Sequence, residues 1–239
     1  MKVVILNSGM GTRMGVLTKE HPKCMTDISD GETILSAQLK RVAELGIKDV
    51  LITTGYFNSV LVDYCESLDL PLNFEYAYNE RYASTNYIYS IYCAEDKLRD
   101  HEVILMHGDM VFEADVFKKV ASHSGSCMAV STTAELPQKD FKAVLKDGKI
   151  VKVGIEFFDD AVAAQPLYKF SAKDWNTWLD RICEFCRDGK TSCYAENAFN
   201  EVSDSMSLLP LDVKDALCNE VDNYEDLCAV SKRFKELSE

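Results

Sequence analysis

A glycine-rich segment near the start of the chain contains residue types suited to binding phosphate. Residues 9–13 read GMGTR and follow the apolar run at positions 2–6. Glycine lets backbone N–H groups turn toward an anion, and open α/β sheets bind ligands at the carboxyl ends of their parallel strands. A P-loop is excluded because Val16 follows Gly15, and a dinucleotide-binding fingerprint is excluded because Met14 occupies the position of its third glycine.

The same region is a cluster of basic residues in an acidic chain. The net charge of the chain is −13, yet positions 9–25 contain the cations Arg13, Lys19 and Lys23. The one acidic residue in that span is Glu20. A guanidinium binds two phosphate oxygens at once and an ammonium supplies a compact point charge, so the pair suits a polyphosphate better than a single carboxylate. The alternative is a flexible surface turn that carries these cations by chance.

Two aspartates far apart in the sequence could hold a divalent cation. Asp109 follows Gly108 after the apolar run at positions 103–106, which predicts that its carboxylate lies at the ligand-binding edge of a sheet. Asp222 comes just before the last expected helix. Mg²⁺ bound to a triphosphate takes one or two protein carboxylates together with phosphate and water oxygens. The alternatives are a solvated surface acid for Asp109 and a helix cap for Asp222.

Alternating strands and helices must position these residues. The expected strands of the first part of the chain lie at 2–6, 49–55, 72–78, 103–106 and 127–133. The expected helices lie at 33–45, 60–68, 87–98, 173–188, 194–202 and 223–237. The last of them should begin with a capping box, with Asn223 as the cap and Asp226 as the acid at the third position. This alternation favours a Rossmann-like α/β fold, with a mostly parallel sheet flanked by helices. Beyond about residue 135 the pattern changes, because Asp147-Gly148 between two apolar runs predicts an inserted β-hairpin.

Nine scattered cysteines indicate reduced thiols rather than a disulfide framework. Cys183 and Cys186 form a CxxC pair with Cys193 nearby, so a zinc or redox site has to be considered. We favour helix packing, because one apolar stripe at helical spacing contains Trp175, Trp178, Leu179, Ile182, Cys183 and Cys186.

The acidic net charge also bears on partners. Duplex nucleic acid and anionic membranes would be repelled on average. The apolar runs are far shorter than the roughly 20 residues that a membrane span requires, and the first of them is too short for the ~7–15-residue apolar region of a signal peptide. We therefore expect no nucleic-acid or membrane partner and a cytoplasmic location, and a homodimer is possible.

The spacing of the glycine-rich segment also resembles a known signature. GxGTRM at positions 9–14, followed by Pro22-Lys23, is similar to the motif of nucleotidyltransferases that activate sugar phosphates and small phosphorylated alcohols. Within that superfamily the chain resembles the bacterial CTP:phosphocholine cytidylyltransferases. The further stretches that carry this resemblance are 78–86, 90–92, 108–109 and 220–223.

The resemblance implies a single nucleotidyltransferase domain over residues 1–239. Its expected parts are a nucleotide-binding core at 1–135, an acceptor-binding insertion with the hairpin and a small helical subdomain at 136–210, and a C-terminal part with a metal-binding aspartate and a helix at 211–239. The implied reaction transfers CMP from CTP to phosphocholine or a similar small amino-alcohol phosphate, with Mg²⁺ as cofactor and pyrophosphate as product.

Roles for individual residues follow from the same resemblance. The implied catalytic residues are Arg13, Lys23 and Asp109, and the implied metal ligands are Asp109 and Asp222. Asn86 could read the cytosine ring or could instead cap the helix from Tyr87. The implied nucleotide-binding residues are Leu6, Asn7, Ser8, Gly9, Gly11, Thr12, Arg13, Lys23, Asn79, Ser84, Thr85, Asn86 and Gly108.

The acceptor would lie under the hairpin and the helices at 173–202. A choline head group calls for aromatic faces and a nearby carboxylate. The expected acceptor-binding residues are Tyr168, Phe170, Tyr194 and Glu196, with Asp159 and Asp160 as further acids. Core packing is the alternative for each of these aromatic side chains.

Three other functions remain open from the sequence. A 2-aminoethylphosphonate acceptor would need the carboxylates more than the rings. A sugar-1-phosphate nucleotidyltransferase would use UTP, dTTP or GTP, although the chain is short for that class. An inactive nucleotide-binding regulatory module is disfavoured, because Arg13, Lys23, Asp109 and Asp222 are all present.

Overall fold

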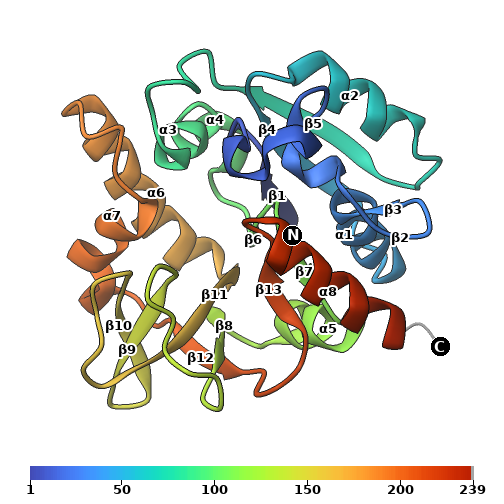
Figure 1. Ribbon diagram of the computed structural model, residues 1–239. Coiled ribbons are helices and arrows are strands. Elements are labelled where there is room, and N and C mark those ends of the chain that lie inside the picture. Colours follow the sequence, from blue (N-terminus) through green and yellow to red (C-terminus); the bar gives the residue numbers. More distant parts are fainter. Residues whose placement is uncertain (238–239) are drawn as a thin grey trace.

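A computed structural model describes residues 1–237 and shows a large mixed sheet with helices packed on both of its faces (Figure 1). From one edge to the other, its main path runs through β10 (Lys149–Gly154), β9 (Lys142–Lys146), β11 (Ala161–Phe170), β6 (Val103–His107), β1 (Lys2–Leu6), β4 (Asp49–Thr54) and β5 (Asn73–Tyr78). Two more strands extend the sheet beside β11, namely β8 (Cys127–Ser131) and β12 (Leu209–Asp212).

The part of the sheet formed by β6, β1, β4 and β5 is parallel. β1 pairs in parallel with β4 and with β6, and β4 pairs in parallel with β5. All five residues of β1 are buried, as expected for a strand covered on both faces. The prediction of a mostly parallel sheet flanked by helices is confirmed, and the carboxyl ends of β1 and β6 meet at one edge.

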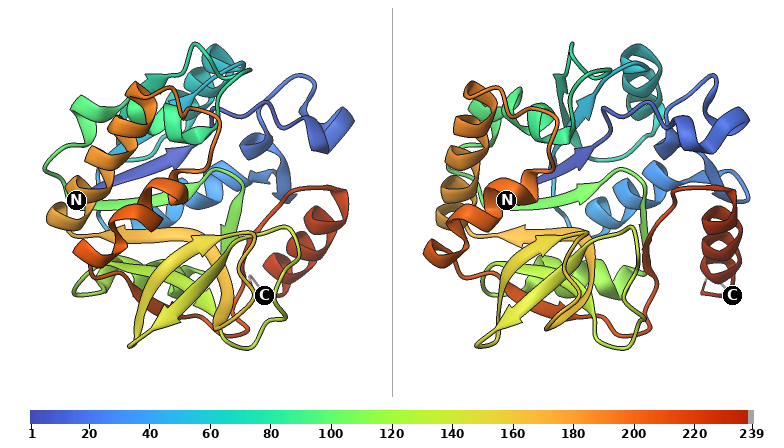
Figure 2. Two further views of the ribbon diagram at one scale, coloured as in Figure 1. Left: turned by 90° about the vertical axis from the view of Figure 1, so that its left-hand side faces the viewer. Right: turned by 60° about the vertical axis from the view of Figure 1, so that its left-hand side comes forward.

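Alternate side chains of β1 enter two separate cores. Val4 belongs to a cluster that includes residues of α3 (Tyr87–Tyr92), α6 (Ala172–Arg187) and α7 (Ala195–Val202). Val3 and Ile5 belong to the opposite cluster, which includes residues of α1 (Ile34–Glu44), α2 (Asn58–Ser67) and α5 (Ala114–Ser122). This two-residue period is what a pleated strand imposes. In Figure 2, α6 and α7 lie together on one side of the molecule.

The last helix, α8 (Tyr224–Glu236), packs in a third cluster, and the predicted capping box at its start is confirmed. The Asn223 side chain accepts hydrogen bonds from the backbone N–H groups of Glu225 and Asp226. Before α8, β13 (Cys218–Glu220) pairs with β7 (Met110–Phe112), and two further short strands, β2 (Asp27–Ser29) and β3 (Glu32–Thr33), pair with each other. The β7–β13 pairing brings the C-terminal segment to the end of β6.

The predicted β-hairpin is also confirmed. β9 and β10 are antiparallel neighbours joined by Asp147 and Gly148, whose φ angles are 51° and 74°. Two left-handed residues in a two-residue turn match the twist of the flanking strands, which is why Asp-Gly is favoured there. The hairpin joins the main sheet through β11 rather than standing apart from it.

Several elements differ from the sequence-based expectation. The single helix expected at 87–98 is divided into α3 and α4 (Glu95–Leu98). β11 and α5 were not predicted. β11 escapes a pattern search because Gln165 and Pro166 interrupt its alternation, where the pairing with β8 also shifts in register. The remaining short elements are the 3₁₀ turns η1 (Thr12–Thr18), η2 (Lys23–Met25) and η3 (Ser203–Ser205).

Cys183 and Cys186 lie on the buried face of α6, as the packing interpretation predicted. All nine cysteines are free thiols.

No helix within residues 1–237 is long and apolar enough to cross a bilayer. The cytoplasmic location, the lack of a nucleic-acid partner and the possible homodimer stay predictions.

Candidate active site

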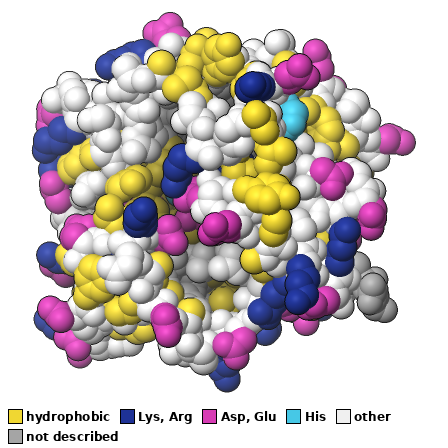
Figure 3. Space-filling model, viewed as in Figure 1, with side chains coloured by type: hydrophobic (Ala, Val, Ile, Leu, Met, Phe, Trp, Pro, Cys, Tyr) yellow, Lys and Arg dark blue, Asp and Glu magenta, His cyan; other side chains and the backbone are white. Residues whose placement is uncertain are grey.

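A pocket of about 400 Å³ opens at the carboxyl ends of β1 and β6. Figure 3 shows a hollow near the middle of this face, edged by basic and acidic side chains and partly lined by hydrophobic ones. The residues expected from the sequence that line the pocket are Leu6, Ser8, Gly9, Gly11, Thr12, Arg13, Lys23, Asn79, Thr85, Asn86, Asp109, Tyr194 and Asp222. The pocket therefore brings together the glycine-rich segment and both aspartates.

Gly11 shapes the first wall of this pocket. Its φ of 64° is left-handed, and its carbonyl accepts a hydrogen bond from the Thr18 hydroxyl at 2.9 Å. An added Cβ would lie 3.2 Å from the Cβ of Lys23. A larger residue would thus be strained in its backbone and would crowd Lys23.

Asn7 and Gly108 lie in an adjoining cavity of about 80 Å³, which shares Lys23 and Asp109 with the main pocket. A Cβ at position 108 would come within 1.6 Å of Asn7 Oδ1, so glycine alone allows the ends of β1 and β6 to approach this closely. Ser84 is exposed and is not among the residues that line the pocket.

Lys23 joins the two distant aspartates. Its Nζ forms ion pairs with Asp109 Oδ2 and with Asp222 Oδ1, the latter at 2.8 Å. Arg13 Nη1 lies 2.7 Å from the other Asp222 oxygen, Oδ2. Segments 13–23, 109 and 222 thus meet at one point. The helix-cap alternative for Asp222 is wrong, because Asn223 caps α8 and the Asp222 carboxylate faces these cations.

Opposite charges keep Lys23 and Asp109 ionised. Burial alone would lower the pKa of Lys23, but the nearby carboxylates of Asp109 and Asp222 outweigh it and raise that pKa. Burial would likewise raise the pKa of Asp109, but the charge of Lys23 dominates and lowers it. At neutral pH the site therefore presents the protonated amine of Lys23 and the ionised carboxylate of Asp109.

One carboxylate oxygen of Asp109 is available to bind a ligand. Its Oδ1 is buried and has no hydrogen-bond partner within residues 1–237. A buried acceptor without a partner is unusual in folded proteins. Since Mg²⁺ binds carboxylate oxygens, the oxygens of Asp109 and Asp222 fit the donor set that such an ion requires.

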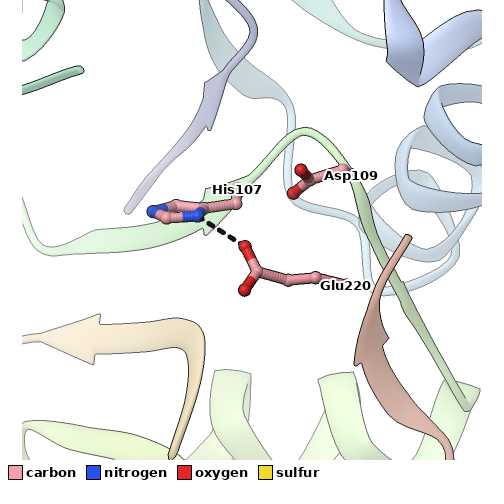
Figure 4. A group of neighbouring side chains, drawn as sticks. All are labelled: His107, Asp109 and Glu220. Atoms are coloured by element: carbon pink, nitrogen blue, oxygen red, sulfur yellow. Dashed lines mark hydrogen bonds and ion pairs between the residues drawn. The ribbon is translucent and has the colours of Figure 1, made fainter. Parts of the chain in front are cut away.

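Sequence analysis missed two neighbours of Asp109. His107, at the end of β6, places Nδ1 2.9 Å from Glu220 Oε1, and both residues line the pocket (Figure 4). Burial and the charge of Asp109 raise the pKa of Glu220. The available signal was the position of His107 two residues before Asp109, and of Glu220 two residues before Asp222.

Aromatic rings form part of the pocket lining, here called the aromatic wall. The ring centroid of Tyr87 lies 4.7 Å from that of His107 and 6.0 Å from that of Tyr194. Phe141 lies 5.2 Å from Tyr194 by the same measure. Tyr87 and Phe141 were not expected at the site. They come from the start of α3 and from the loop before β9, so residues on both sides of position 135 contribute to this wall.

Of the residues expected to contact the acceptor, only Tyr194 lines the pocket. Glu196 is 2% exposed and accepts hydrogen bonds from the hydroxyls of Tyr87 and Tyr168, so it lies behind the aromatic wall. Tyr168 is itself buried in the core. Neither Asp159 nor Asp160 lines the pocket, and both are exposed in the β10–β11 connection.

The expectation that Phe170 offers a ring to the acceptor is wrong. Phe170 is 0% exposed and packs against Trp178, with ring centroids 5.1 Å apart. Tyr168 and Phe170 are two residues apart on β11 and point to the same buried face. A direct acceptor contact by Tyr168 is ruled out by the same burial.

Two asparagines expected to bind the nucleotide, Asn79 and Asn86, use their side chains in hydrogen bonds within the protein. Asn79 uses its amide to bind Thr85, Ser90 and the backbone N–H of Arg81, which fixes the loop after β5. Asn86 Oδ1 accepts the Tyr87 backbone N–H at 2.7 Å and so caps α3, while the residue also lines the pocket. The capping alternative for Asn86 is therefore correct, and base reading by this residue stays a prediction.

Comparisons with known proteins identify the family of this chain. Residues 3–180 match the family model of the MobA-like NTP transferase domain. The chain belongs to this family. The nucleotidyltransferase resemblance inferred from the sequence is confirmed at that level.

Curated relatives of this NTP transferase include several cytidylyltransferases. It is 26% identical over 160 residues to CTP:phosphoglutamine cytidylyltransferase of Campylobacter jejuni, covering 64% of this chain and 62% of that protein. It is 30% identical over 104 residues to choline-phosphate cytidylyltransferase of Streptococcus pneumoniae, covering 44% and 43%. The chain thus spans less than two thirds of the length of these relatives.

Solved structures share the fold across almost the whole chain. CTP:phosphocholine cytidylyltransferase from Streptococcus pneumoniae superposes with a TM-score of 0.78 at 18% identity, covering 98% of both chains. The inositol-1-phosphate CTP transferase from T. maritima gives 0.79 at 19% identity, covering 100% of this chain and 96% of the other. At these identities the match establishes the fold alone.

Proposed function

We propose that this chain is a cytidylyltransferase that transfers CMP from CTP to phosphocholine or a similar small amino-alcohol phosphate and releases pyrophosphate. The observation that carries the proposal is the position of Lys23 between Asp109 and Asp222, with Arg13 on the far side of Asp222. Two cations and two carboxylates at a glycine-rich loop suit a triphosphate with its divalent cation.

The chemistry requires positioning rather than a side-chain nucleophile. An ionised oxygen of the acceptor phosphate attacks the α-phosphorus of CTP in line, and pyrophosphate leaves from the opposite side. Lys23, which stays protonated, would stabilise charge at the α-phosphate and hold the two anions together. Arg13, whose side chain is 72% exposed at the pocket mouth, would bind the β- and γ-phosphates.

Mg²⁺ fits the donor set, and the residues that would hold it are Asp109 and Asp222. When bound, such an ion polarises the α-phosphate and neutralises part of the triphosphate charge. The nucleotide would be bound by residues of the 1–135 segment, and the acceptor by the wall to which the 136–210 segment contributes Phe141 and Tyr194.

The aromatic wall supports an acceptor with a cationic end. Tyr87, Phe141 and Tyr194 present rings to the pocket, and the carboxylate of Glu196 lies directly behind Tyr87. Ring faces attract quaternary ammonium groups, and a carboxylate bound to the Tyr87 hydroxyl adds negative potential to that ring. The choline-phosphate cytidylyltransferase among the relatives acts, by its name, on such a head group.

One observation favours 2-aminoethylphosphonate as the second candidate acceptor. Asp140 lines the pocket next to Phe141 and offers a carboxylate that a primary amine could contact directly. A relative from Streptomyces rubellomurinus, 28% identical over 122 residues, covering 51% of this chain and 19% of that protein, is named CMP-5′-(3-aminopropyl)phosphonate synthase. The two acceptors differ in the methylation of the nitrogen and in the link to phosphorus, which is an ester oxygen in phosphocholine and a carbon in the phosphonate, so a direct comparison separates them.

Pyrophosphate release tests the proposal. CTP, UTP, dTTP and GTP are each combined with phosphocholine, 2-aminoethylphosphonate or glucose-1-phosphate, with and without Mg²⁺. We expect release with CTP and an amino-alcohol phosphate, and only with the metal present. Release with glucose-1-phosphate would assign the chain to the sugar-1-phosphate class, and no release in any mixture would favour a nucleotide-binding module.

A further inference from the structure

Three side chains in the pocket converge on one point. A ring nitrogen of His107 and one oxygen each of Asp109 and Glu220 lie within 4.8 Å of one another. Figure 4 shows a ring nitrogen of His107 facing the Glu220 carboxylate, with the Asp109 carboxylate beside them, and the three residues come from the end of β6, the end of β13 and the turn after β6. Since metal bonds to nitrogen and oxygen are about 2.0–2.2 Å long, one ion can reach all three after small side-chain adjustments.

The two oxygens of Asp109 are divided between two environments. Oδ2 pairs with Lys23, which also binds Asp222. Oδ1 is buried and has no hydrogen-bond partner within residues 1–237. The three-residue cluster therefore contains a free carboxylate oxygen that the Lys23 ion pair does not use.

Arg13 and Lys23 do not pair with every carboxylate oxygen of this three-residue cluster. Arg13 and Lys23 pair with Asp222 and with one side of Asp109. The ion-pair partner of Glu220 within the described residues is His107, which is positive only when protonated. The side chains of Asp109 and Glu220 are only 17% and 19% exposed, and carboxylates shielded from water in this way are normally paired with a cation or bound to a metal. The Asp109 Oδ1 atom and the Glu220 carboxylate therefore offer ligand oxygens that neither Arg13 nor Lys23 binds.

We propose that His107, Asp109 and Glu220 form a divalent-cation site that favours a transition ion such as Mn²⁺ over Mg²⁺. Imidazole nitrogen is a ligand for transition ions, whereas Mg²⁺ takes oxygen ligands. This donor set shares Asp109 with the Asp109–Asp222 pair, but it includes a nitrogen and uses Glu220 in place of Asp222. The site lies in the pocket of the proposed function, but it stands independently of which nucleotide binds there.

Mn²⁺ alone, added to the full chain without nucleotide, tests the site. Free Mn²⁺ is followed by its electron paramagnetic resonance signal, and pulsed measurements on the bound ion detect ¹⁴N coupling from a directly bound imidazole. We expect one bound ion with ¹⁴N coupling, and a change in that coupling when the histidines carry ¹⁵N. Displacing Mn²⁺ should take at least about tenfold more Mg²⁺ than Mn²⁺.

His107→Gln should abolish the nitrogen coupling and weaken Mn²⁺ binding by at least about tenfold. His101→Gln is the matched control, because His101 is exposed and lies before the opposite end of β6. If His107→Gln fails to fold by circular dichroism, Glu220→Gln serves as the second variant and should weaken Mn²⁺ binding similarly.

Bound Mn²⁺ without nitrogen coupling would overturn the site, as would unchanged affinity in His107→Gln or no Mn²⁺ binding by the wild type. None of these results depends on CTP. Failure of this proposal therefore leaves the outcome of the pyrophosphate assay unaffected, and failure of that assay leaves the Mn²⁺ result standing.

Discussion

At the scale of single residues, the site divides between positions readable from sequence and positions that only packing reveals. Arg13 and Lys23 stand out as cations of one short segment in an acidic chain. His107 carries no such signal, because a lone histidine at a strand end is compatible with many roles. Phe170 shows the converse error. Its residue type suits an ammonium ligand, yet β11 turns the ring into the core.

Tyr194→Ala tests the aromatic wall. We expect the KM for the cationic acceptor to rise about five- to thirty-fold, since a desolvated cation–π contact contributes roughly 1–2 kcal/mol. The KM for CTP should stay near the wild-type value, because the ring belongs to the acceptor side. Steady-state kinetics with each substrate varied in turn measure both.

Tyr224→Ala is the control for Tyr194→Ala, because Tyr224 is 66% exposed at the start of α8 and does not line the pocket. A rise in the KM for CTP equal to that for the acceptor would contradict the assignment of Tyr194 to the acceptor.

Among the helices and strands, sequence patterns predict the features that neighbouring residues determine. The Asp147-Gly148 turn and the Asn223 capping box are confirmed because both are local backbone requirements. β11 could not be predicted, since its alternation is interrupted and its partners β6, β8 and β9 are distant in the sequence. The β7–β13 pairing is equally non-local, although it places Glu220 and Asp222 at the site.

Asn223→Ala tests the cap of α8. The substitution removes the oxygen that accepts hydrogen bonds from the backbone N–H groups of Glu225 and Asp226. We therefore expect a loss of about 1 kcal/mol in the free energy of unfolding. For a chain of this size that corresponds to a fall in Tm of roughly 2–4 °C. Thermal unfolding followed by circular dichroism measures it.

Asn197→Ala on α7 is the matched control for the cap, because Asn197 is exposed on the helix surface. Its effect should stay within about 0.5 kcal/mol. Equal destabilisation by the two substitutions would mean that the Asn223 hydrogen bonds do not stabilise α8.

At the scale of the whole molecule, the pocket is a junction of three segments. The glycine-rich loop follows β1, Asp109 follows β6, and Asp222 comes from the segment before α8. Topology explains the meeting of the first two, because β1 and β6 are parallel neighbours whose carboxyl ends coincide. The backbone bond from Val221 N–H to Asp109 C=O, at 2.9 Å, attaches the third.

A ligand that bridges these segments should stabilise the entire fold. With Mg²⁺–CTP at about 100 times its Kd, the expected gain in the free energy of unfolding is about 2.7 kcal/mol, which raises Tm by roughly 5–10 °C. Thermal unfolding with CTP and with GTP at equal concentration measures the effect and its base preference. Equal shifts with both nucleotides would contradict selection of cytosine.

The most direct test of the central claim, that Lys23 grips the nucleotide between Asp109 and Asp222, is the turnover of Lys23→Ala. Lys19→Ala is the matched control, because Lys19 is an exposed lysine of the same segment. With CTP, Mg²⁺ and the preferred acceptor, the account predicts a loss of about 100-fold or more in kcat for Lys23→Ala and little change for Lys19→Ala. Near-normal turnover by a folded Lys23→Ala variant would contradict it.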